Sequence, residues 1–167
     1  SGGDTTGTII DEAIRHSITK FSHVHFPGTE LSAKRLRMMG EDPWRIHMVG
    51  TPGVDIKSEL NVTSGEVCSS LGLKDGQRIL VVLQHPVTTN VEDANRQMRE
   101  TLSAIASIQN PTIVIYPNSD AGGREMIKVI KEYEHLPYIH SFKNIPRRTY
   151  LGLLNVATVI IGNSSSA

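Results

Sequence analysis

The stretch ILVVLQHPVTTN, residues 79–90, sets five apolar residues directly before a glutamine, a histidine and a proline. An apolar, β-branched run without polar alternation is typical of a strand covered on both faces, as in a parallel sheet. The run therefore predicts a buried strand over 79–83, and His85 falls where that strand ends. In open α/β sheets, ligands bind beyond the carboxyl ends of the strands. His85 is therefore a candidate functional residue.

Strand-like and helix-like segments alternate along the rest of the chain. The runs at 112–116 and 158–162 also predict strands, and apolar residues at helical spacing predict helices over 91–108, 123–134 and 149–157. Such alternation is typical of βαβ units, which build parallel sheets with right-handed crossovers. The predicted fold class is α/β, with parallel sheets and helices on both faces.

The N-terminal third repeats this alternation in shorter segments. HVHF (23–26) and RIHMVG (45–50) predict strands, and ELSAKRLRMMG (30–40) predicts a helix between them. The stretch from 52 to 76 is more polar and dotted with glycine. We interpret it as the connection between two α/β units, and a crevice between two such units is a favoured ligand site.

Composition excludes several classes of function. Lys and Arg together number 17, as do Asp and Glu, so the formal net charge is zero and a basic surface for nucleic acid or anionic membrane is not expected. No apolar run reaches the length of a membrane span, and the N-terminus lacks the features of a signal peptide. A single cysteine, Cys68, offers neither a disulfide nor a zinc or redox pair. We expect a cytoplasmic protein, and the missing initiator Met predicts a fragment of a longer one.

Polar, turn-forming residues follow the predicted strands of the second half. They are QHP at 84–86, PNSD at 117–120 and GNSSS at 162–166. Because the carboxyl ends of parallel strands share one edge, these residues could build one site. Closely spaced backbone N–H groups and hydroxyls at a helix start suit a phosphate.

Each of these segments also has a simpler interpretation. GNSSS could be a plain helix N-cap, DAGG (120–123) an Asp cap and a turn, and His85 a histidine that only completes a strand end. Together, on adjacent turns, they favour a nucleotide-like ligand. The sequence contains neither GxGxxG nor GxxxxGK[ST], so neither the dinucleotide nor the P-loop fingerprint applies.

Ionisable residues gather near the first predicted helix start: Asp4, Asp11, Glu12, Arg15 and His16. Carboxylates in a crevice can serve as general acid and base. Asp11 and Arg15 are spaced i,i+4, so an ordinary surface ion pair is the simpler interpretation. His23 and His25 share one face of a predicted strand, but no third ligand is evident, so we predict no metal site.

Five segments, in order along the chain, resemble the UDP-N-acetylglucosamine 2-epimerase family, and in particular its hydrolysing branch in sialic acid synthesis. They are IDEAIRHSITKFSHVHF, VGTPGVD, LQHPVTT, YPNSDAGG and IIGNSSSA. The resemblance implies parts of two Rossmann-like domains of a GT-B-type fold. Residues 1–52 would be the C-terminal part of the first domain, and residues 53–167 the N-terminal part of the UDP-binding domain. It also implies a homo-oligomer, a dimer or tetramer, of the full-length protein.

The resemblance assigns roles on the UDP side of the site. His85 in LQHPVTT matches the histidine that contacts the diphosphate and assists the departure of UDP. Asn118 in YPNSDAGG, with Ser164 and Ser165 in GNSSS, matches positions that hold the UDP moiety.

On the sugar side the resemblance assigns two carboxylates to proton transfer. Asp11 in IDEAIRH matches one position, and Asp4 fits the acid that follows a Gly-Gly pair. Ser1 departs from the Glu or His that the family usually carries before that pair. A further catalytic Asp of the family lies upstream of this chain.

The implied reaction removes the C2 proton of the sugar and expels UDP, which gives a 2-acetamidoglucal. Water then adds and releases the free 2-epimer, N-acetylmannosamine, without a metal or redox cofactor. The non-hydrolysing branch carries PEExNR where this chain has IDEAIR, which favours hydrolysis.

Other functions remain open from sequence. The same chemistry could act on a UDP-2,4-diacetamido sugar, or the enzyme could be a non-hydrolysing 2-epimerase. A GT-B glycosyltransferase and a nucleotide-binding domain without catalysis are the alternatives from other classes.

Overall fold

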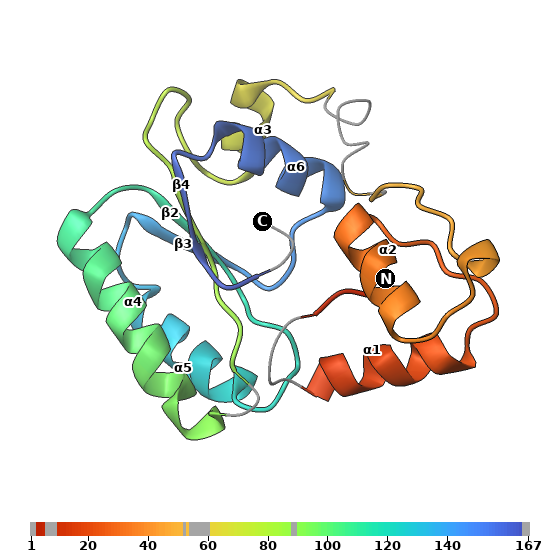
Figure 1. Ribbon diagram of the computed structural model, residues 1–167. Helices are drawn as coiled ribbons and strands as arrows, with labels where there is room; N and C mark the ends of the chain where they lie inside the picture. Colours follow the sequence, from red (N-terminus) through yellow and green to blue (C-terminus); the bar gives the residue numbers. More distant parts are fainter. Residues whose placement is uncertain (1–2, 6–9, 52, 54–60, 88–89, 165–167) are drawn as a thin grey trace. The chain divides into compact units, whose positions relative to one another are not determined.

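The computed structural model describes residues 3–5, 10–51, 53, 61–87 and 90–164. The chain divides into two compact units, Ser1–Lys57 and Ser58–Ala167, and each is described here by itself (Figure 1). Within these residues, no helix is long and apolar enough to cross a membrane. The assignment of residues 1–52 and 53–167 to two larger domains stays a prediction.

The second unit is built on a parallel sheet of four strands in the order β3-β2-β1-β4. The strands are β1 (Leu80–Leu83), β2 (Thr112–Ile115), β3 (Ile139–Phe142) and β4 (Val159–Gly162). Val81 of β1 lies opposite Ile113 of β2 on one side and Ile160 of β4 on the other. The predicted parallel sheet is confirmed, including its fully buried strand β1.

Helices cover both faces of this sheet (Figure 1). On one face lie α4 (Ala94–Ile108), preceded by the short 3₁₀ helix η3 (Val91–Asp93), and α5 (Gly123–Tyr133). On the other lie α3 (Ser64–Ser70) and α6 (Arg147–Val156).

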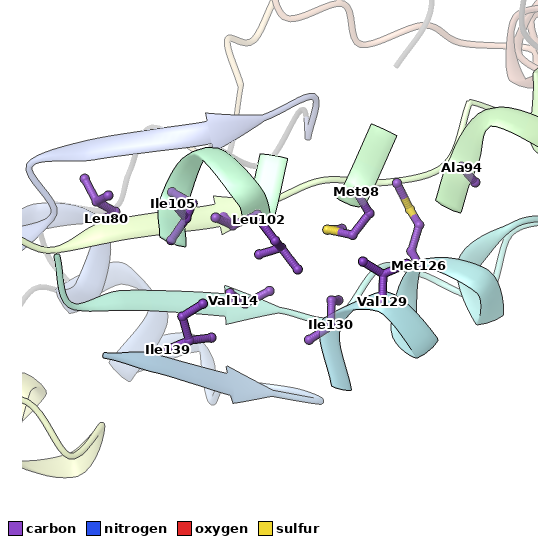
Figure 2. Packing of buried hydrophobic residues seen from close by; sticks show 11 residues of the cluster. Leu80, Ala94, Met98, Leu102, Ile105, Val114, Met126, Val129, Ile130 and Ile139 are labelled. Carbon is purple, nitrogen blue, oxygen red and sulfur yellow. The ribbon is translucent and has the colours of Figure 1, made fainter. Parts of the chain in front are cut away.

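Successive residues of β1 point to opposite faces and so belong to different cores. Leu80 and Val82 pack with the α4–α5 side, whereas Val81, together with Ile79 just before the strand, packs with the α3–α6 side. Figure 2 shows how the apolar stripes of α4 and α5 meet the sheet, with Leu102 over the strands and Ile130 near their arrowhead ends. Each fully buried Leu or Ile stabilises the fold by about 1.5–3 kcal/mol.

Two elements of this unit were missed by the sequence prediction. Helix α3 lies inside the stretch that we interpreted as a linker, and it begins with a capping box. Thr63 Oγ1 accepts a hydrogen bond from the Glu66 backbone N–H at 3.3 Å, and Glu66 Oε2 accepts one from the Thr63 N–H at 2.8 Å. Strand β3, with the sequence IHSF, lies at an edge of the sheet and is only partly buried, so it lacks the apolar run of an inner strand.

The first unit contains α1 (Ile10–Phe21), α2 (Glu30–Met38) and the 3₁₀ helix η1 (Pro43–Arg45). Its small core consists of Ala33, Leu36 and Ile46. The strands expected over 23–26 and 45–50 are wrong as full strands, because the described residues there form only one parallel bridge, between His25 and Ile46. The pairing continues with one hydrogen bond from the Val49 N–H to the Pro27 carbonyl at 3.3 Å, but Pro27 has no N–H with which to extend the ladder.

A partly buried polar link ties the segments of the first unit together, with His25 and Glu41 buried and Lys20 exposed. His25 Nε2 lies 3.2 Å from Glu41 Oε2, and Lys20 Nζ lies 2.7 Å from Glu41 Oε1. The hydrogen bond from Lys20 lowers the pKa of Glu41, and the one to His25 adds to this, although desolvation opposes both. The link joins the end of α1 to the residues that follow α2.

Candidate active site at the carboxyl edge of the sheet

Successive strands are added to the sheet first on one side of β1 and then on the other. From β1 the chain continues to β2 and then β3, whereas β4 returns to the other side of β1. The carboxyl ends of β1 and β4 therefore flank a topological switch point, where ligands of open α/β sheets bind. His85 follows β1 and Asn163 follows β4, so both residues lie at this point.

The polar residues that follow three strands do come together around His85. Its backbone N–H donates to Asn163 Oδ1 at 2.8 Å, and Asn163 Nδ2 donates to the His85 carbonyl at 3.0 Å. The backbone N–H of Asn118, after β2, donates to His85 Nδ1 at 3.2 Å. Sequence reasoning singled out His85 and Asn118 but missed the contact made by Asn163.

The hydrogen bond from Asn118 decides which ring nitrogen of neutral His85 carries the proton. A nitrogen that accepts a hydrogen bond has no proton of its own, so in the neutral ring the proton lies on Nε2. No described residue bonds to Nε2. The arrangement therefore leaves one N–H donor available to a ligand at the edge of the sheet.

The loop after β2 is shaped by its own side chains. Asn118 Nδ2 donates to Asp120 Oδ2 at 2.6 Å, and the Asp120 carbonyl accepts from the Gly123 N–H at 2.9 Å. The expected Asp cap on α5 is wrong, because its N-cap is Gly122, at φ 94°, and makes no side-chain hydrogen bond. At Gly123 a Cβ atom would lie 2.5 Å from the Asn118 carbonyl oxygen, so only glycine permits this close turn.

A cavity of about 350 Å³ opens beside Asn118. It lies at the carboxyl edge of β2 and the start of α5. Two cations, Arg124 and Lys143, contribute to its wall. A phosphate or carboxylate would therefore be attracted to this part of the edge.

At the end of β4, glycine again permits a close approach. Gly162 has φ 147°, and a Cβ atom there would lie 2.0 Å from the Leu83 carbonyl oxygen. Ser164 is partly buried next to this turn. Ser165 lies outside the described residues, so the predicted phosphate contacts of this serine pair stay predictions.

In the first unit, Asp4 is held at the start of α2. Ser32 Oγ donates to Asp4 Oδ1 at 2.6 Å, and Gly3, at φ 77°, lets the backbone pass close to Ser32. The unpaired amides at a helix N-terminus favour a nearby negative charge. Asp4 is thus an ordered, partly buried carboxylate.

Asp11 lies on an exposed part of α1 and lines a cavity of about 390 Å³. Arg15 and His25 line the same cavity, whereas Asp4 is not among its lining residues. The structure therefore does not bring the two predicted catalytic carboxylates to one cavity wall within this unit. The predicted Asp11–Arg15 ion pair stays a prediction.

The neighbouring pair Glu12 and His16 was not expected to interact. His16 Nε2 lies 3.5 Å from Glu12 Oε1, an i,i+4 spacing on α1. Glu12 Oε2 and His16 Nδ1 are buried without a hydrogen-bond partner among the described residues. Nowhere in the described part of the chain do three or more His, Cys, Asp or Glu side chains gather closely enough to hold a metal ion.

The family model described as UDP-N-acetylglucosamine 2-epimerase matches residues 1–167, the whole of this sequence. The chain belongs to the UDP-N-acetylglucosamine 2-epimerase family. The predicted family is therefore confirmed.

Curated relatives in this family carry different substrate names. The chain is 35% identical over 166 residues to a UDP-N,N'-diacetylbacillosamine 2-epimerase (hydrolyzing) of Legionella pneumophila, which covers 99% of this chain and 44% of the relative. It is 32% identical over 165 residues to a UDP-N-acetylglucosamine 2-epimerase of Neisseria meningitidis, and this match covers 99% of this chain and 43% of the relative. The chain thus spans less than half the length of these epimerases, which agrees with the expectation of a longer protein.

Solved epimerase structures share the fold. The Neisseria meningitidis UDP-GlcNAc 2-epimerase bound to UDP-GlcNAc matches with a TM-score of 0.80 at 14% identity, over 99% of this chain and 47% of that one. The Methanocaldococcus jannaschii UDP-GlcNAc 2-epimerase in complex with UDP-GlcNAc and UDP matches with a TM-score of 0.70 at 17% sequence identity. The match covers 93% of this chain and 44% of that one. The predicted fold class, α/β of the GT-B type, is confirmed.

Proposed function

We propose that the full-length protein is a hydrolysing UDP-N-acetylglucosamine 2-epimerase, which releases UDP and N-acetylmannosamine. The observation that carries this proposal is His85, held by Asn118 and Asn163 at the switch point of the sheet, with its Nε2–H bonded to none of the described residues. Membership of the epimerase family supports it, as does the word "hydrolyzing" in the name of the Legionella relative. The same word stands in the name of a GDP/UDP-N,N'-diacetylbacillosamine 2-epimerase of Campylobacter jejuni, to which the chain is 30% identical over 169 residues.

On the UDP side, the Nε2–H of His85 donates to an oxygen of the leaving diphosphate. Negative charge develops there as the C1–O bond breaks, and a fixed donor in that position typically contributes about 2.7–4 kcal/mol to lowering the barrier. Asn118, Ser164 and Ser165 hold the UDP moiety, and Arg124 and Lys143 add positive charge nearby.

On the sugar side, Asp4 and Asp11 serve proton transfer. One carboxylate takes the C2 proton, the C1–C2 double bond forms, and the electron pair of the C1–O bond leaves with UDP. Water then adds to C1 of the 2-acetamidoglucal while a proton returns to the opposite face of C2. The hydrogen on C2 is not acidic, and elimination avoids a free carbanion. No step calls for a metal or redox cofactor.

A second substrate is favoured by a specific observation. Two relatives, at 35% and 30% identity, are named as diacetylbacillosamine epimerases, whereas the Neisseria relative is named for N-acetylglucosamine. A UDP-2,4-diacetamido sugar would undergo the same elimination and hydration, since the C4 substituent takes no part in either step.

Product analysis separates these possibilities. The full-length protein is incubated with UDP-GlcNAc or with the UDP-2,4-diacetamido sugar, and UDP and the free sugar are followed by chromatography. Free N-acetylmannosamine with an equal amount of UDP supports the proposal. UDP-N-acetylmannosamine instead would indicate the non-hydrolysing reaction, and turnover only with an added acceptor would indicate a glycosyltransferase.

Three further properties belong to the same proposal. Residues 1–52 and 53–167 form parts of the sugar-side and UDP-binding domains, the enzyme is a homo-oligomer, and it acts in the cytoplasm to supply sialic acid synthesis. Sedimentation of the full-length protein tests the oligomeric state: a single monomeric species would contradict it.

A further inference from the structure

We propose that Asn163 is a positioning residue for His85, and that its carboxamide holds the His85 backbone so that the imidazole presents Nε2–H to the ligand. This inference rests on the proposed function. It concerns a residue that makes no contact with the reacting atoms and acts through His85.

The Asn163 side chain continues the ladder between β1 and β4 beyond its last backbone pair. That last pair is Leu83 with Gly162. Further along, the His85 N–H donates to Asn163 Oδ1 at 2.8 Å and the His85 carbonyl accepts from Asn163 Nδ2 at 3.0 Å. A carboxamide has the same donor and acceptor as a peptide group, so it satisfies both backbone groups of His85 as a neighbouring strand would.

Few other side chains could make this contact. Aspartate lacks the N–H donor, alanine lacks both groups, and glutamine places its amide one methylene further from the backbone. The contact also depends on Gly162, because a Cβ atom at that position would collide with the Leu83 carbonyl and push the ends of β4 and β1 apart. Glycine and asparagine therefore act together at the end of β4.

The second anchor of His85 acts on the ring. The Asn118 N–H donates to Nδ1 at 3.2 Å, which is near the long end for such a bond, so a small shift of the His85 backbone would break it. Without this bond the neutral imidazole can carry its proton on either nitrogen. Loss of the Asn163 contact should therefore change both the position of the ring and the share of the Nε2–H tautomer.

The test compares Asn163→Ala and Asn163→Asp with Asn155→Ala in the full-length protein. Asn155 is an exposed asparagine of α6, so its variant is a matched control. We expect kcat of Asn163→Ala to fall by about 10- to 100-fold, the scale of a displaced catalytic group, with KM changed by only a few-fold. Asn163→Asp, which keeps the acceptor, should lose less, and Asn155→Ala should match the wild type.

A spectroscopic measurement without substrate completes the test. In protein labelled with ¹⁵N at histidine, the His85 signals, assigned by their loss in His85→Gln, should report Nδ1 as the acceptor nitrogen in the wild type. In Asn163→Ala they should shift toward exchange between the two tautomers. Unchanged His85 signals would overturn the inference, as would a variant that loses thermal stability but keeps wild-type kcat.

The two proposals can fail separately. If the wild-type protein turns over neither UDP-sugar, the proposed function fails, and the spectra still decide the role of Asn163. If Asn163→Ala does not fold, the same spectra of Asn163→Asp decide it, with a shifted tautomer supporting the inference and an unchanged one overturning it.

Discussion

At the scale of single residues, the proposed chemistry depends on how the fold restricts one imidazole, that of His85. A histidine at a strand end is common, and most such residues have no special role. His85 differs because Asn118 occupies Nδ1 and leaves Nε2 without a partner among the described residues. A neutral ring in this state donates a hydrogen bond from Nε2, to which none of the described residues bonds.

His85→Ala should reduce kcat of the full-length enzyme by about 10²-fold or more while the fold survives, because it removes the donor to the leaving diphosphate. Steady-state release of UDP measures the rate, and a thermal melt checks the fold. His135→Ala is a suitable control, since His135 is exposed and its ring bonds to the Glu132 carbonyl. A near wild-type rate for His85→Ala would remove His85 from the chemistry.

The position of His85 could be predicted from sequence, but the role of Asn163 could not. An apolar run ending in a polar residue identifies a strand end by itself. The contact of Asn163 requires β4 to lie beside β1, and a strand 76 or more positions later in the chain gives no local signal of that pairing. The glycine before Asn163 was the available clue, because glycine at a strand end often marks a close backbone approach.

At the scale of elements, prediction succeeded where burial on both faces produces a long apolar run. It succeeded for β1 and β2 and for the helices with strong apolar stripes, and also for β4, whose apolar run forms an edge strand that is mostly exposed. It missed α3, whose seven residues are too short for a clear period, and β3, whose edge position admits His140 and Ser141. In the first unit, two β-rich segments form only a single bridge, since a strand depends on its neighbours more than on its own sequence.

Because α3 is so short, its capping box should matter for its local stability. Thr63→Ala removes the side-chain acceptor for the Glu66 N–H, and such caps typically contribute about 1 kcal/mol. Hydrogen exchange of the α3 amides should therefore accelerate by about fivefold, while the amides of α4 keep their rates. Thr158→Ala, at an exposed threonine, is the control, and equal α3 exchange in both variants would contradict the prediction.

The link through Glu41 predicts a pH dependence of stability in the first unit. Lys20 and then His25 hold the pKa of Glu41 below its usual 4.5, so its contribution to stability is complete above about pH 4.5 and is lost as the pH falls through the lowered pKa. The difference in unfolding free energy between wild type and Glu41→Gln should therefore be constant near neutral pH and shrink in acid. A difference that grows as the pH falls would contradict this.

At the scale of the whole molecule, the proposed chemistry is divided between two units of the chain. The groups proposed for UDP are His85, Asn118, Ser164 and Ser165, all in the second unit, whereas the carboxylates proposed for the sugar, Asp4 and Asp11, belong to the first. Binding of UDP and proton transfer at C2 should therefore respond to different substitutions. This separation gives the most direct test of the carboxylate roles.

Asp11→Asn should abolish product formation in the full-length enzyme and leave UDP affinity near normal. The change is nearly isosteric and Asp11 is exposed on α1, so stability should change by no more than about 0.5 kcal/mol. Calorimetry with UDP, thermal melting and deuterium incorporation at C2 in heavy water measure the three properties. Glu30→Gln, which removes an exposed partner of Arg37, is the control for loss of a surface carboxylate.

The combination of results decides the role of Asp11. A folded Asp11→Asn variant that binds UDP but forms no product and exchanges no deuterium supports proton transfer by this carboxylate. A folded variant that forms product and incorporates deuterium at the wild-type rate would instead make Asp11 an ordinary surface residue of α1. In that case Asp4, which accepts a hydrogen bond from Ser32, would be the remaining candidate of the two proposed carboxylates. The same measurements on Asp4→Asn would then show whether Asp4 transfers the C2 proton.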